Sequence, residues 1–301
     1  MRGRWMDGSL RLVAAVALGA LLPLALANAA LAQQAPASAE LKRVIGRVEI
    51  LRKGQTQWIP AVIGARLVEG DDIRSFSGAQ AELAMPDTSA VLLAENSRLL
   101  MTKIEYDQQQ QSRLVLLHLV VGKVRAAIAQ SAITLVRSRQ SNFGISTPTA
   151  VAAARGTIVW VYTDGTRTLV AVEPEPGLRI VPRIECITVA ATQQPKRQMV
   201  LAGYATTDCG PSVAIPPQFL TLSNPAGAGT TALLNAAAVS VPGNIEQLVT
   251  GTGDLQAAAP VSFSATGGDG GGPALSSIGV DAVINQQQSQ VLSPPPASPI
   301  Q

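Results

Sequence analysis

The sequence predicts an all-β domain followed by a tail of low sequence complexity. Apolar residues alternate with polar ones in short runs, as at Val48 and Ile50, over 81–85 and over 124–128. This period of two is typical of strands with one buried face, and no stretch keeps the 3.6-residue period of a helix. Glycines that favour turns separate the runs, at positions 54, 64, 70, 78, 122, 144, 165 and 177. This spacing favours a single domain built as a sandwich, a barrel or a β-helix.

The first 32 residues predict a secretion signal. Three arginines precede an uncharged apolar run from Leu12 to about Leu26, and an A-x-A motif ends at Ala32. We therefore expect cleavage between Ala32 and Gln33 and a periplasmic or secreted mature protein. An uncleaved membrane anchor is the alternative, since the segment is long enough to span a bilayer. Pro23 and Asn28 favour cleavage, so membrane contact is expected only if this segment is retained.

Composition divides the rest of the chain into three parts: a linker at 33–42, a β domain at 43–210 and a tail at 211–301. The tail has no Lys or Arg and is dense in Ala, Gly, Pro, Ser and Gln. Such a composition buries too little apolar surface to offset about 1–2 kcal/mol of backbone entropy per residue. We therefore expect a disordered tail. Its glycine run at 267–272 lacks the strand, helix and Lys of a phosphate loop and indicates a linker.

The segment Ser146–Thr163, with the sequence STPTAVAAARGTIVWVYT, is the most informative stretch of the domain. An Ala-rich strand leads into Arg155-Gly156-Thr157, and an alternating strand follows. Upstream lie, in order, Gly46-Arg47-Val48, Gly64-Ala65-Arg66-Leu67, Gly70-Asp71-Asp72-Ile73, Asp87-Thr88-Ser89, Ser97-Arg98-Leu99 and Gly122-Lys123-Val124. Together these motifs resemble the FecR domain family over residues 43–181. The resemblance implies a twisted, layered, β-helix-like arrangement of strands.

Two departures from the family pattern fall in loops. Thr88 replaces the usual Gly of an Asp-Gly-Ser turn, so we expect a turn with positive φ to be disfavoured there. Pro174-Glu175-Pro176 is inserted where the family has Glu-Gly. Neither change alters the strand pattern. Both put in doubt any partner contact that the family makes through these loops.

The Arg155-Gly156-Thr157 motif is the one place where a charged residue suggests a specific role. Gly156 suits a backbone bend or a close approach within a sheet. Arg155 stands among small residues, and its planar guanidinium can make several hydrogen bonds at once. We expect it to tie a turn of the β core, with a partner contact as the alternative.

The residue inventory argues against an enzyme, a metal site and a cofactor site. His118, the only histidine, lies in an apolar run and is expected to be a packed side chain with one hydrogen bond. It leaves no second base or ligand for catalysis or zinc. Asp71 and Asp72 follow Gly70 and are expected to cap a turn in solvent. Lys and Arg occur singly along strands, which predicts solvated outer faces and no nucleic-acid partner.

Cys186 and Cys209 are the only cysteines and follow the predicted export signal. Disulfides persist outside the cytoplasm, so we expect a bond between them that closes a loop of about 24 residues. Two free thiols are the alternative. Two ligands without a nearby histidine would make a poor metal site.

These observations predict a non-catalytic, exported binding or signalling module of the bacterial cell envelope. In the best-known FecR proteins this domain relays a signal from an outer-membrane transporter to a sigma-factor regulator. No cytoplasmic domain precedes the apolar segment here, so we do not expect that circuit. The expected partner is an envelope protein, or a wall or surface polymer. The alternative is a structural component of the envelope or of a secreted surface layer.

Overall fold

The structure, a computed structural model, describes residues 36–109, 112–129, 142–154, 156–174, 183–189, 196–224, 227–250 and 261–264. The predicted signal segment, its cleavage site at Ala32 and Gln33, and Arg155 lie outside these ranges. Within them, no helix is long and apolar enough to cross a membrane.

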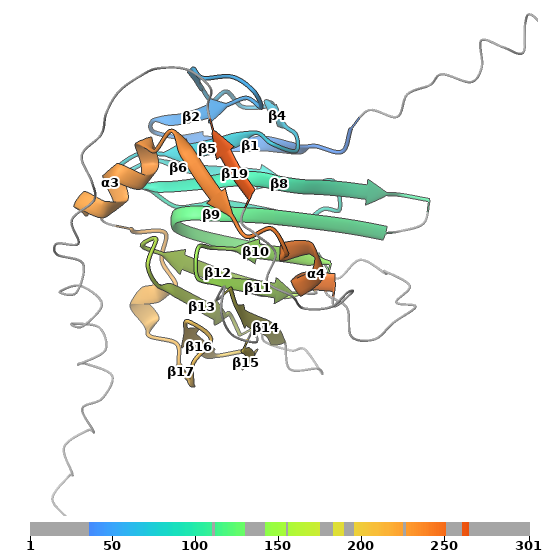
Figure 1. Cartoon of the computed structure of the whole chain (residues 1–301), viewed down its shortest axis with the longest axis vertical. Coiled ribbons are helices and arrows are strands. Elements are labelled where there is room, and N and C mark those ends of the chain that lie inside the picture. Colours follow the sequence, from blue (N-terminus) through green and yellow to red (C-terminus); the bar gives the residue numbers. More distant parts are fainter. Residues whose placement is uncertain are drawn as a thin grey trace, which may run out of the picture. The chain divides into compact units, whose positions relative to one another are not determined.

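Seventeen strands form two layers that share the long strand β9 (Ser112–Ala127) (Figure 1). Layer A contains, in spatial order, β4 (Arg66–Leu67), β1 (Ala39–Ile45), β6 (Gln80–Ala84), β7 (Ala90–Leu93), the end of β9, β12 (Ile158–Thr163), β13 (Thr168–Val172), β16 (Tyr204–Thr207) and β17 (Ser212–Ala214). Layer B contains β3 (Trp58–Pro60), β2 (Val48–Leu51), β5 (Asp72–Ser75), β8 (Ser97–Asp107), the start of β9, β10 (Phe143–Ser146), β11 (Ala150–Ala154), β14 (Arg183–Thr188) and β15 (Arg197–Leu201).

The chain passes back and forth between the two layers, and only the β9–β10 pairing is parallel among those described. Alternate residues of each strand face the other layer and form one apolar core. In β9, Val115, Leu117 and Leu119 belong to that core, whereas Leu116 and Val120 face outward. The all-β prediction is confirmed, and the strands form two layers of mostly antiparallel pairs.

Glycines mark the places where the chain changes layer. At Gly122, φ is 102° and β9 leaves layer B for layer A. A Cβ at this position would overlap the Cα and side chain of Ser97, so only glycine fits. Gly156 has φ 80° between β11 and β12, in line with the bend that its sequence context predicts.

The prediction for Thr88 is wrong, because its φ is 69°. Its neighbours hold the turn in place. The Asp87 carboxylate accepts hydrogen bonds from the Ser89 amide (3.1 Å) and hydroxyl (2.7 Å), and it also pairs with the buried Arg113. These contacts impose the left-handed conformation on a residue that disfavours it by about 1–2 kcal/mol.

Thr88→Gly should therefore stabilise the domain by about 0.5–1 kcal/mol, since Thr88 is exposed and loses little packing. Denaturant midpoints measure the effect. Asn96→Gly is the matched control: Asn96 also has positive φ (50°), but its side chain donates to the Asn224 carbonyl (2.8 Å). That change should destabilise the protein. Equal effects at both positions would contradict the explanation.

The predicted disorder of 211–301 is wrong for its first half. After β17 come the short helix η2 (Pro217–Phe219), α3 (Ala228–Asn235), β18 (Ala238–Val241) and α4 (Ile245–Thr250), and β18 pairs with β19 (Val261–Ser264). We call residues 215–224 and 227–250 the C-terminal belt. Its first arm, 215–224, packs on the outer face of layer A, and its second arm, 227–250, packs on layer B. The belt's apolar residues are too few for a core of their own, but they are buried against the sheets.

Candidate functional surface

The belt covers the apolar part of the outer face of each layer. On layer A, Phe219 of the first arm lies beside Trp160, with ring centroids 6.3 Å apart, and both side chains are buried. On layer B, buried residues of β18 and α4 cover the outward apolar residues of four strands: Leu100, Leu116, Val120, Val151, Ala153 and Ile187. The belt therefore shields two apolar faces that would otherwise meet water.

Lys123, at the start of the layer A part of β9, is held by the first arm. Its ammonium donates to the carbonyls of Phe219 (3.4 Å), Thr221 (3.2 Å) and Ser223 (3.1 Å). The residue is 6% exposed, and no carboxylate of the described residues pairs with it. Burial lowers the pKa of Lys123 to about 8. This lysine is thus a buried cation that neutral backbone oxygens solvate.

Two buried arginines of layer B hold the end of α3. Arg74 donates to the Leu234 carbonyl (3.1 Å) and to Asn235 Oδ1 (2.9 Å). Arg98 donates to the carbonyls of Leu233 (3.2 Å) and Ala236 (2.7 Å). Cationic side chains at a helix C-terminus satisfy its free carbonyls and favour its dipole. The second arm is therefore fixed by charge as well as by apolar packing.

The same arginines are paired with carboxylates and aromatic rings of layer B. Arg74 pairs with Glu49 (2.7 Å) and lies 4.0 Å from the Trp58 ring centroid. Arg98 donates to Asp72 Oδ2 through Nε (2.9 Å), and its Nη2 lies 2.7 Å from the same oxygen. Burial raises the pKa of Asp72, although Arg98 opposes that shift. The predicted solvated faces are wrong for these arginines, for Lys123 and for Arg113, because the belt and the loops cover them.

The neighbouring Asp71 and Asp72 are both buried, so their predicted exposure to solvent is wrong. The capping role of Asp71 is confirmed. Its carboxylate accepts the amides of Lys53 (2.9 Å) and Val68 (3.1 Å) and pairs with Arg52 (2.7 Å). Asp71 thereby ties the loop that follows β2 to the loop between β4 and β5. Within the described ranges, no group of three or more His, Cys, Asp or Glu side chains could hold a metal ion.

At two glycines of the layers, side chains of the second arm occupy the space that a Cβ atom would take. At Gly144 of β10, a Cβ would lie 2.5 Å from Val249 Cγ2 of α4. At Gly165, in the β12–β13 turn, a Cβ would overlap Leu233 Cδ1 of α3, and φ is 95°. Both positions therefore need glycine for the belt to close on the layers.

His118 confirms the prediction of a packed side chain with one hydrogen bond. It is fully buried, and its Nδ1 lies 2.9 Å from Ser146 Oγ. Nε2 has no hydrogen-bond partner among the described residues. Burial, and then the nearby charge of Arg98, lower the pKa of His118 to about 3. The imidazole is therefore neutral at pH 7.

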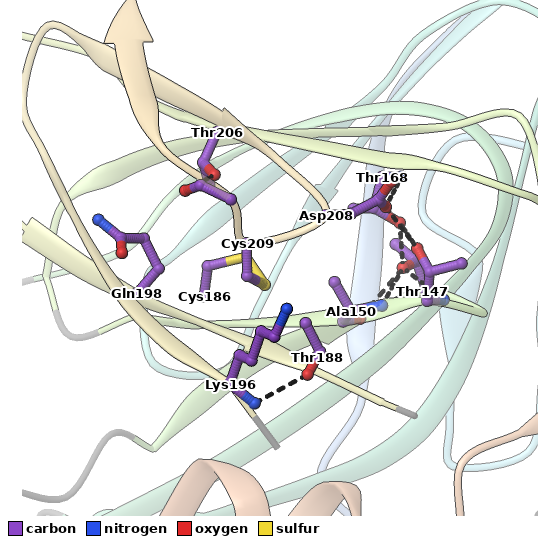
Figure 2. Close-up of a disulfide and its surroundings, with 12 residues drawn as sticks. Thr147, Ala150, Thr168, Cys186, Thr188, Lys196, Gln198, Thr206, Asp208 and Cys209 are labelled. Carbon is purple, nitrogen blue, oxygen red and sulfur yellow. Dashed lines mark hydrogen bonds between the residues drawn. A yellow bond between two sulfur atoms is a disulfide. The ribbon is translucent and has the colours of Figure 1, made fainter. Parts of the chain in front are cut away.

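The predicted disulfide between Cys186 and Cys209 is present, with the two Cα atoms 5.3 Å apart (Figure 2). It joins β14 of layer B to the β16–β17 turn of layer A. In that turn Asp208 and Cys209 have φ of 47° and 54°. The Asp208 carboxylate accepts the Thr168 amide (2.7 Å) and the Thr149 hydroxyl (3.1 Å). The bond thus fastens the two layers just before the belt begins.

Replacing both Cys186 and Cys209 by Ser should lower the free energy of unfolding by about 3 kcal/mol, the loop-closure term for 23 residues of separation. Urea unfolding of the oxidised wild type and the double variant measures it. The reduced wild type should unfold like the variant. An unchanged midpoint would show that the layers need no covalent fastening.

The most exposed large apolar side chains lie at one end of the layers, in and beside the β3–β4 loop. Val62 and Ile63 are 64% and 67% exposed, and Ile59 of β3 is 41% exposed. We call these three residues the edge patch. Among the described strands, β3 and β4 have no further neighbour on that side. Exposed apolar side chains at an open sheet edge are typical of an interaction surface.

Sequence reasoning missed the belt, although one signal pointed to it. The run Leu114–Val121 in β9 and the run Ala150–Ala154 in β11 are apolar on both faces of their strands. A continuous apolar run indicates a strand that is covered on both sides. The second layer covers only one side, so another part of the chain had to cover the other.

The comparisons with known proteins give one family and two solved structures. Residues 71–174 match the family model described as "FecR protein". Two crystal structures of a "putative anti-sigma factor" from Parabacteroides distasonis ATCC 8503 are each 14% identical to the chain with a TM-score of 0.31, and the matches cover 73% of this chain and 91% and 90% of those chains. No curated protein matches. The family match includes the Arg155-Gly156-Thr157 motif and most of the motifs that predicted it. Residues 71–174 of this chain therefore match the FecR domain family.

Proposed function

We propose that this protein is an exported, non-catalytic binding or signalling module of the bacterial cell envelope. The FecR match over 71–174 is the observation that carries the proposal, since it is a regulatory and not an enzymatic family. The disulfide between Cys186 and Cys209 supports export, because such bonds persist in oxidising compartments. N-terminal sequencing of the native protein tests export. We expect Gln33 as the first residue, and Met1 in a cytoplasmic fraction would contradict it.

The edge patch is the surface best suited to a protein partner. The belt covers the apolar parts of the outer faces, whereas Ile59, Val62 and Ile63 are exposed beside two strand edges. Pro60 removes an amide from the edge of β3, which disfavours pairing with another strand. We therefore expect contact through the apolar side chains of this patch.

Capture from envelope extract with the full-length mature protein tests the binding role. Wild type should retain one stoichiometric protein, and Val62→Ser with Ile63→Ser should lose it. Met199→Ser with Leu201→Ser is the matched control, since these side chains are similarly exposed on β15 at the other end of the layers. Equal capture by both variants would exclude the edge patch. Co-fractionation with insoluble wall material would favour the alternative, a structural component of the envelope or surface layer.

A further inference from the structure

We propose that the second arm of the C-terminal belt is an acid-released strap, opened by protonation of His118. Such a strap would regulate the module whichever partner it binds. His118 takes no part in the edge patch.

His118 lies beneath the second arm. Its neighbours on the same face of β9, Leu116 and Val120, pack against that arm. Leu100 of β8 and Ser146 of β10 lie directly opposite it in the sheet. Leu100 belongs to the same apolar cluster, and His118 has no exposed surface. The side chain is therefore reached by solvent only when the arm lifts.

The hydrogen bonds of Ser146 assign the tautomer of His118. Ser146 Oγ has one proton, so both of its hydrogen bonds form at once only if it donates to the Leu117 carbonyl (3.1 Å) and accepts from His118 Nδ1 (2.9 Å). Nδ1 thus carries the proton of the neutral ring, and Nε2 is the bare nitrogen. Since Nε2 has no partner among the described residues, a proton added there would be a buried donor without an acceptor.

Protonation and closure of the arm therefore oppose each other. The closed form holds the pKa of His118 at about 3, whereas an exposed histidine has a pKa of about 6.5. A group whose pKa is lower in the closed form favours closure above pH 6.5. That contribution is lost as the pH falls from 6.5 towards 3. At pH 5 the open fraction of the arm should rise about 25-fold over its value at pH 7.

The other charged groups around His118 and the arm must be separated from it. Arg98 of β8 and Asp72 of β5 form the ion pair nearest the ring. Arg74 of β5, which also holds the end of α3, pairs with Glu49 of β2 (2.7 Å). Glu246 of α4 pairs with Lys103 of β8 (2.9 Å) and joins the arm to the sheet. The strands β10 and β18 and the helix α3 contain no charged residue. Asp72, Glu49 and Glu246 are thus the acids whose protonation could imitate the effect.

Hydrogen exchange on the full-length protein at pH 7 and pH 5, corrected for the intrinsic rate, tests the strap. Amides of 228–250 should exchange about 25-fold faster at pH 5, whereas those of 112–127 should not. His118→Asn keeps a donor towards Ser146 but does not titrate, and it should abolish the response. Glu246→Gln is the control and should retain it. Equal acceleration in wild type and His118→Asn, or in both segments, would overturn the proposal.

The single histidine gives a second, independent measurement on unmodified protein. Its NMR signal should show a neutral ring between pH 7 and pH 5 in molecules whose arm is closed. Titration of that signal with a pKa near 6.5, without a change in exchange of 228–250, would also overturn the proposal. This measurement decides the question if His118→Asn does not fold.

Discussion

A chain that ends at Ile215 should melt at least about 10 °C below the full chain. The truncation exposes the outer apolar faces of both layers and removes the carbonyls that solvate Lys123, Arg74 and Arg98. A buried charge that loses its partners costs several kcal/mol. In a domain of this size each kcal/mol shifts the Tm by about 2–4 °C.

A second truncation, after Ser264, is the matched control, because it retains every described residue. The difference in Tm between the two truncated chains isolates the contribution of the belt. The shorter chain should also bind a dye that reports exposed apolar surface, and the longer one should bind less. If both truncated chains melt together, the belt contributes nothing to stability and the contacts described for it are weak.

Gly122→Ala should lower the free energy of unfolding by about 3–5 kcal/mol. At φ 102° a side chain strains the backbone, and its Cβ would overlap the Cα of Ser97, the first residue of β8. Ser97 cannot move away easily, because its hydroxyl accepts the Lys123 amide (2.9 Å) and donates to the Glu95 carbonyl (2.9 Å). Both hydrogen bonds hold the corner where β9 changes layer.

Gly203→Ala separates strain from overlap. Gly203 also lies at a crossing between layers, with φ 85°, but a Cβ there meets no atom within 4 Å. We expect a cost of about 1–2 kcal/mol from the backbone alone. Chemical unfolding of both variants gives the comparison. Similar losses at the two glycines would show that Ser97 yields and that the corner at Gly122 is not tightly packed.

Local patterns were sufficient for the strands, the FecR resemblance and the cysteine pair. The alternation around Val48 and Val124 depends only on which residues face the core, so it survives any arrangement of the layers. The disulfide followed from two cysteines and an export signal, without any geometry. The turn at Thr88 did not follow, because its conformation depends on Arg113, which pairs with Asp87 only in the folded chain.

Periodicity, motifs and cysteine count predicted an all-β FecR-like domain with a disulfide. The cover on the outer apolar faces became visible only in the folded chain. Composition indicates only whether a segment can form an apolar core of its own, and the tail beyond Pro211 cannot. Phe219, Leu234 and Leu248 are buried nonetheless, because the sheets supply the apolar surface that the tail lacks. The belt also buries His118 and Lys123, two polar residues on the outer face of β9.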